Sequence, residues 1–98
     1  MNYKIDFSED ALSKLEALGT DNAKIMKQVF MKCLALRRNP NPQDCEDLRN
    51  FIYKGFKGHR VDQGEYRIIF AVDEDHKKVV IGPILNRNED YKEIKKMR

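Results

Sequence analysis

The chain has 98 residues, 19 basic and 16 acidic side chains, a formal net charge of +3 and 41% hydrophobic residues. This composition is too apolar for a disordered tail and too polar for a membrane protein. No run approaches the roughly 18 consecutive apolar residues that a membrane span needs. The length predicts a single domain over residues 1–98. The first residues show no secretory pattern, so we expect a cytoplasmic protein with no membrane partner.

The first half of the chain predicts one strand and two helices. Residues 3–7 alternate apolar and polar side chains, as a short strand does. Ser8 follows as the expected N-cap of a helix, and Gly19 is expected to end it. Thr20 or Asp21 would cap a second helix, which the Asn-Pro-Asn-Pro stretch stops. The short link between the helices predicts an antiparallel helical hairpin.

The second half predicts mainly strands. Residues 43–50 are expected to form a loop or a short helical turn. The aromatic and basic run after them is followed by a predicted tight turn at Gly64-Glu65. Residues 66–72 alternate as a half-buried strand does, and residues 78–85 are apolar on both faces, as in a buried strand. Pro83 indicates a bulge or the end of that strand. The remaining residues predict a short C-terminal helix.

The predicted fold class is therefore α+β, in the order β-α-α-β-β-β-α. We expect an antiparallel sheet that packs one face on the helical hairpin. The other face should stay open, because too few elements remain to cover it.

Positive charge is concentrated in two blocks of +4 each, over residues 21–38 and 49–60. We interpret the first block as a solvated helix face. The second interleaves bases with aromatic side chains, a composition suited to phosphates and stacked nucleobases. Arg67, on the next predicted strand, should either pair with an acid or hold an anionic ligand.

The sequence predicts no metal site and no cofactor. Cys33 and Cys45 lack the Cys-x-x-Cys spacing of a zinc or redox motif, and His59 and His76 are isolated.

Two stretches of the sequence resemble one protein family. The run from Arg60 to Phe70 (RVDQGEYRIIF) resembles the signature of the RelE/ParE toxin superfamily. The apolar strand that ends in the run from Asn86 to Tyr91 (NRNEDY) is similar to the last strand and catalytic C-terminal turn of these toxins. The resemblance spans nearly the whole chain and is nearest to the RelE-like mRNA interferase branch.

The resemblance implies the toxin of a type II toxin–antitoxin system, with a cognate antitoxin protein as its partner. A RelE-like toxin would act as a ribosome-dependent endoribonuclease that cleaves mRNA in the ribosomal A site without a metal and inhibits translation. DNA would be contacted only indirectly, through the antitoxin complex. Two alternatives stay open, namely inhibition of DNA gyrase, as in the ParE branch, and a non-catalytic RNA-binding module.

The residues that match the family's catalytic set are Arg60, Arg67, Arg87 and Tyr91. Further bases expected to bind RNA are Arg49, Lys54, Lys57 and His59. RelE-type toxins often carry two alternating bases on the basic strand, whereas Asp62 occupies the second position in this sequence.

Metal-free cleavage uses the 2′-hydroxyl of the RNA as nucleophile. It needs a proton acceptor, a proton donor for the leaving 5′-oxygen, and positive charge at the phosphate. We expect Arg60 and Arg67 to hold the phosphate and Arg87 to serve the leaving oxygen. Lys57, His59 or Tyr91 would be the base, and Tyr91 could instead stack on a nucleobase.

Overall fold

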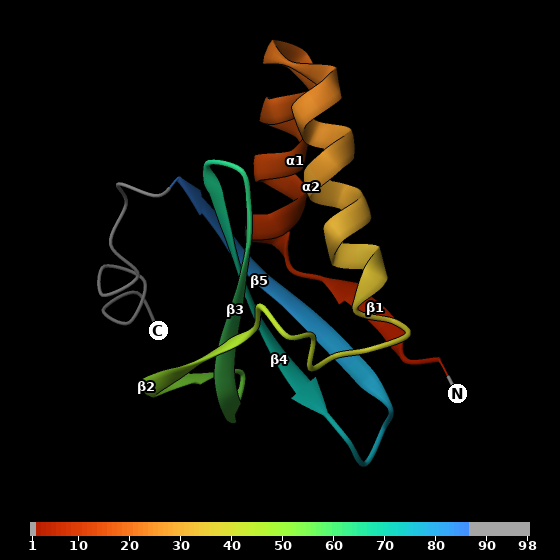
Figure 1. The fold of residues 1–98 in the computed structure, drawn as a ribbon, viewed down its shortest axis with the longest axis vertical. Helices are drawn as coiled ribbons and strands as arrows, with labels where there is room; N and C mark the ends of the chain where they lie inside the picture. Colours follow the sequence, from red (N-terminus) through yellow and green to blue (C-terminus); the bar gives the residue numbers. More distant parts are fainter. Residues whose placement is uncertain (1, 87–98) are drawn as a thin grey trace.

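The computed structural model of the chain describes residues 2–86, without the side chains of residues 49–51. The elements in chain order are β1 (Lys4–Phe7), α1 (Glu9–Asp21), α2 (Ala23–Ala35), β2 (Glu46–Tyr53), β3 (Phe56–Gln63), β4 (Tyr66–Asp73) and β5 (Lys78–Asn86). The strands form one sheet in the order β1-β5-β4-β3-β2 (Figure 1). β1 runs parallel to β5, and the other neighbouring strands are antiparallel. The α+β class is confirmed, but the sheet is mixed and not antiparallel throughout as expected, because β1 pairs in parallel with β5.

The two helices form the predicted hairpin, but a single residue joins them. Ser8 caps α1 as predicted, because its Oγ accepts a hydrogen bond from the backbone N–H of Ala11 at 3.1 Å. The predicted end at Gly19 and the predicted caps at residues 20 and 21 are wrong. Asn22 closes α1 by donating its N–H to the carbonyl of Leu18, and its Oδ1 accepts from the N–H of Ile25 to open α2. Asn22, whose backbone is extended, thus satisfies a carbonyl at the end of α1 and an N–H group at the start of α2.

The main core lies between the helices and one face of the sheet. Both helices cover this face, as Figure 1 shows. The buried side chains include Ala11, Leu15 and Leu18 of α1, Val29 and Cys33 of α2, and Val61, Ile68, Phe70, Val79 and Ile81 of the sheet. No helix within residues 2–86 is long and apolar enough to cross a membrane.

Residues 43–50 were expected to form a loop or helical turn, but most of them belong to strand β2. The run after them is a hairpin, because Lys54 and Gly55 both adopt positive φ (54° and 85°) between β2 and β3. Two left-handed residues are what a tight two-residue hairpin needs, since their twist matches that of the strands. The sheet therefore gains one strand over the prediction. The tight turn predicted at Gly64-Glu65 is confirmed, with Gly64 at φ 60°.

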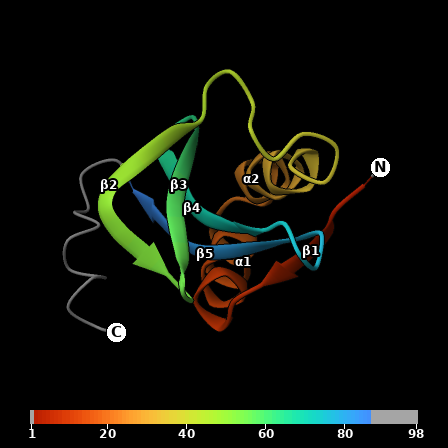
Figure 2. The same cartoon turned by 90° about the horizontal axis from the view of Figure 1, so that it is seen from below.

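The face of the sheet opposite the helices is partly covered, contrary to the expectation of an open face. A second, smaller cluster buries Leu48 and Tyr53 of β2 against Ile69, Ala71 and Leu85 of the sheet. β2 can reach over this face because residues 48–51 stand opposite residue 58 of β3, a bulge that bends the strand. Figure 2 shows β2 as a strongly curved strand at the sheet's edge.

The bulge predicted at Pro83 is confirmed. Ile68 pairs with Ile84 and Phe70 with Ile81, so two β5 residues, 82 and 83, stand opposite one β4 residue. The predicted C-terminal helix lies outside the described residues.

Candidate functional site

Arg60 and Arg67 lie on the same face of the sheet, opposite the helices. Arg60 pairs in register with Ile69, which belongs to the second cluster, and Arg67 pairs with Asp62 and with Leu85 on its other side. Side chains alternate between faces along a strand, so residues 60 and 62 of β3 and 67 and 69 of β4 share one surface. We call this surface, which carries Arg60, Asp62 and Arg67, the arginine face.

Arg67 is half-buried, and its fully buried Nε finds no hydrogen-bond partner among residues 2–86. Within residues 2–86 no ion pair involves Arg67, although Asp62 stands directly opposite it. A buried donor left without a partner costs about 1–3 kcal/mol, so proteins rarely tolerate one without a reason. Of the two expectations for Arg67, this geometry favours the anionic ligand.

Arg60 is held by two carboxylates. Its Nη2 lies 2.7 Å from Oε2 of Glu46 on β2, and its Nε lies 4.0 Å from Oδ1 of Asp62. Only 20% of the Arg60 side chain is exposed, which fixes the guanidinium on the arginine face. Sequence reasoning missed Glu46, because residues 43–50 were assigned to a loop. Two carboxylates thus stand beside the arginines, and a carboxylate is able to accept a proton from a substrate hydroxyl.

Lys57 and His59 lie on the other face of the sheet. The His59 ring centroid is 5.4 Å from that of Phe70, a residue of the helix-side core. Asp47 on β2 binds both bases, with its oxygens 3.0 Å from Lys57 Nζ and 2.8 Å from His59 Nδ1. These hydrogen bonds, the one from Lys57 first, lower the pKa of the Asp47 carboxyl. The structure therefore does not bring Lys57 or His59 together with Arg60 and Arg67.

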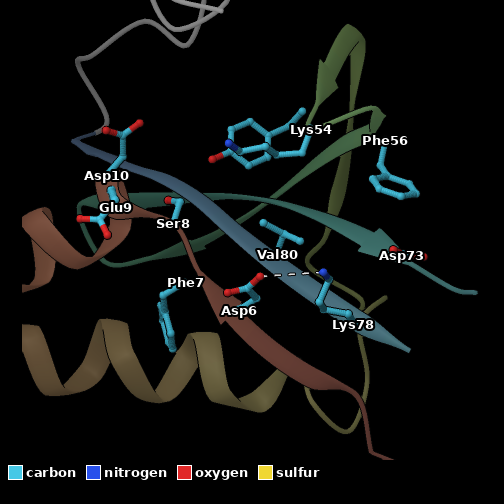
Figure 3. Close-up of a pocket in the computed structure, with 11 residues that line it drawn as sticks. Asp6, Phe7, Ser8, Glu9, Asp10, Lys54, Phe56, Asp73, Lys78 and Val80 are labelled. Atoms are coloured by element: carbon cyan, nitrogen blue, oxygen red, sulfur yellow. Dashed lines mark ion pairs between the residues drawn. The ribbon is translucent and has the colours of Figure 1, made fainter. Parts of the chain in front are cut away.

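Lys54 lies at a separate hollow of about 470 Å³ on the arginine side of the sheet (Figure 3). This hollow is near the start of β5, whereas Arg67 faces the end of that strand. Lys54 Nζ stands 5.8 Å from the ring centroid of Tyr53, and Lys78 Nζ lies 3.9 Å from Oδ2 of Asp6, which also lines the hollow. Of the remaining predicted residues, Arg87, Tyr91 and the side chain of Arg49 lie outside the described part of the chain.

The fold is that of a small toxin of the RelE/ParE superfamily. The family model described as "ParE toxin of type II toxin-antitoxin system, parDE" matches residues 5–91. The chain therefore belongs to this family of toxins, which confirms the resemblance found in its sequence. A comparison with curated protein sequences gives no match.

Solved structures with the same fold come from bacteria and an archaeon. The toxin–antitoxin complex RelBE2 of Mycobacterium tuberculosis matches at 23% identity over 91% of this chain and 95% of that one, with a TM-score of 0.71. The RelE–RelB complex of Pyrococcus horikoshii matches at 19% identity over 92% and 100%, with a TM-score of 0.74. The isolated RelE toxin of Escherichia coli matches at 20% identity over 97% of both chains, with a TM-score of 0.69. At these identities the likeness concerns the fold.

Proposed function

We propose that this toxin is a ribosome-dependent endoribonuclease that cleaves mRNA in the ribosomal A site without a metal and so inhibits translation in the cytoplasm. The observation that carries the proposal is the buried Nε of Arg67 on the arginine face, which has no hydrogen-bond partner in the described part of the chain. A guanidinium can bind two phosphate oxygens at once, and a phosphate would supply the missing acceptor.

The reaction begins when the 2′-hydroxyl of the RNA attacks the adjacent phosphorus. The new bond closes a 2′,3′-cyclic phosphate, and the bond to the 5′-oxygen breaks. Arg67 stabilises the charge that develops on the phosphoryl oxygens, and loss of such a donor costs on the order of 10²–10³ in rate. Glu46 accepts the proton of the 2′-hydroxyl, and Arg60 orients its carboxylate across the 2.7 Å ion pair.

The choice of Glu46 as proton acceptor replaces the earlier candidates Lys57 and His59. Both of those side chains lie on the helix side of the sheet and are bound to Asp47. Arg87 is the group proposed to protonate the leaving 5′-oxygen, regaining its own proton from water, and Tyr91 is proposed to stack on a nucleobase. Arg49 and Lys54 remain proposed RNA contacts.

We also propose that a cognate antitoxin protein binds and restrains the chain, and that DNA is reached only through that complex. Two of the solved structures with this fold, from M. tuberculosis and P. horikoshii, are toxin–antitoxin complexes. The ribosome and its message are the proposed target of the free toxin.

Inhibition of DNA gyrase is the second candidate function. The matching family model carries the name of the ParE toxins. The ion pairs of Arg60 and Lys57 with carboxylates of β2 also favour it, because the positive charges of these two side chains are already neutralised. A non-catalytic RNA-binding module is the third, and it predicts no growth arrest when the chain is expressed alone.

Primer extension on a message translated by purified ribosomes tests the nuclease proposal. The parent chain should produce breaks in the A-site codon, and Arg67→Ala should reduce them by at least about 10². Arg38→Ala is the matched control, because Arg38 is an exposed arginine after α2, remote in sequence from the arginine face. Intact message together with gyrase-dependent DNA breaks would replace the nuclease by the gyrase inhibitor. Equal cleavage by the Arg67→Ala variant would refute the assigned role of Arg67.

A further inference from the structure

A hollow of about 610 Å³ lies on the helix side of the sheet, between the β3–β4 turn and the first part of α2. Tyr66, the first residue of β4, and Ile25 of α2 are among the residues that line it. Both residues pack against the main core, so the base of the hollow is fixed in place. None of the functional roles given above uses this hollow.

The sheet register gives this hollow a specific chemical pattern. Tyr66 pairs in register with Gln63 on one side and with Asn86 on the other. Directly opposed residues share a face, so a carboxamide stands on each side of the aromatic ring. Gln28, an exposed residue of α2, adds a third carboxamide to the lining.

Carboxamides and an aromatic ring are the groups that read an unpaired nucleobase. A carboxamide presents a donor and an acceptor side by side, which matches the N6 amine and N7 acceptor of adenine. Unpaired bases of RNA stack on aromatic side chains. Glu65, also in the lining, adds an acceptor suited to an exocyclic amine. We infer that this hollow is a nucleobase subsite that binds an unpaired adenine of the RNA. This inference rests on the proposed action of the chain on mRNA.

The subsite lies next to the proposed reaction centre. Tyr66 and Arg67 are consecutive in β4, so their side chains point to opposite faces at the same end of the sheet. The rim between them is the tight turn at Gly64-Glu65. A single strand of RNA that crosses this rim can place a phosphate at Arg67 and a neighbouring base against Tyr66. The side chain of Lys14, whose Nζ is 5.9 Å from the Tyr66 ring centroid, adds positive charge near that ring.

Fluorescence anisotropy with the full chain and three labelled RNA pentamers tests the subsite. The pentamers are UUAUU, UUGUU and UUUUU, and no ribosome is present, so binding is read without cleavage. The parent should bind UUAUU about tenfold more tightly than the other two, the order expected for one bidentate carboxamide–adenine pair. The double variant Gln28→Ala/Gln63→Ala should bind all three alike. The control Gln43→Ala removes an exposed carboxamide in the segment before β2 and should keep the preference.

Two variants of Tyr66 separate stacking from base reading. Tyr66→Phe should keep both affinity and preference, whereas Tyr66→Leu should weaken all three pentamers by several-fold or more, with thermal melting confirming that it is folded. Equal binding of all pentamers by the parent, no binding of any, a preference for UUGUU as strong as for UUAUU, or a preference that survives the double carboxamide variant would overturn the subsite. A parent that prefers adenine but cleaves no message would sink the nuclease proposal alone.

Discussion

Replacing Arg67 by methionine should stabilise the folded chain while it removes activity. The buried Nε of Arg67 has no acceptor among the residues that the structure describes, and an unsatisfied buried donor costs about 1–3 kcal/mol. Methionine keeps a long unbranched stem over the second cluster and brings no N–H group. The free energy of unfolding should therefore rise by about 1–3 kcal/mol. For a domain of this size each 1 kcal/mol raises Tm by roughly 4–8 °C.

Urea unfolding followed by far-UV circular dichroism measures this gain. Arg67→Met should move the transition midpoint to higher urea with an unchanged slope, which indicates a true change in stability. The control Arg38→Met, at an exposed position, should stay within about 0.5 kcal/mol of the parent. If Arg67→Met is less stable than the parent, Arg67 contributes to the fold through contacts that outweigh its unpaired donor, and the argument for an anion site is refuted.

Four further substitutions test single contacts of the structure. Glu46→Gln should lower message cleavage by about 10²–10⁴ in the ribosome assay without weakening RNA binding, and unchanged cleavage would remove Glu46 as the base. Gly82→Ala should cost about 1–3 kcal/mol in a urea titration, because its Cβ would lie 3.1 Å from a backbone oxygen of β4 and from the ring of Tyr53. Gly19→Ala, whose nearest neighbour would be 3.6 Å away, should instead stabilise the helix by about 0.5–1 kcal/mol, and equal effects of the two changes would contradict the packing described. Asp47→Asn should reduce the dependence of stability on pH in acid. The pKa of Asp47 in the folded chain lies below its ordinary 3.8, so the contribution of this carboxylate to the free energy of unfolding is present above that value. The contribution is lost as the pH falls through the folded pKa, and asparagine cannot make or lose it. Urea midpoints that fall as steeply in acid for the variant as for the parent would show that Asp47 contributes nothing.

The elements that the sequence predicted well are those whose pattern is complete within one segment. The strand at 66–72, the bulge at Pro83 and the cap at Ser8 each depend on neighbours a few residues away. β2 was missed because its evidence is tertiary. Its pairing with β3 is interrupted by a bulge, and it is held by Leu48 and Tyr53 packing on distant strands.

The candidate site could be predicted only in part, because some of its contacts join segments that are distant in the sequence. The family motif identified Arg60 and Arg67, and the structure places both on one face. The separation of His59 from Arg60 was available from the sequence, because consecutive strand residues point to opposite faces. The contact of Glu46 with Arg60 could not be predicted, because it depends on the register of β2 with β3 and residues 43–50 were assigned to a loop.

The central claim is that the 2′-hydroxyl of the message is the nucleophile and that Arg67 stabilises the charge it creates. Ribosomes stalled on a message with a single 2′-deoxy nucleotide at the cleavage position test it most directly. The parent chain should cut the all-ribose message, leave a 2′,3′-cyclic phosphate, and leave the deoxy message intact. Cleavage of the deoxy message at the rate of the ribose message would contradict the mechanism.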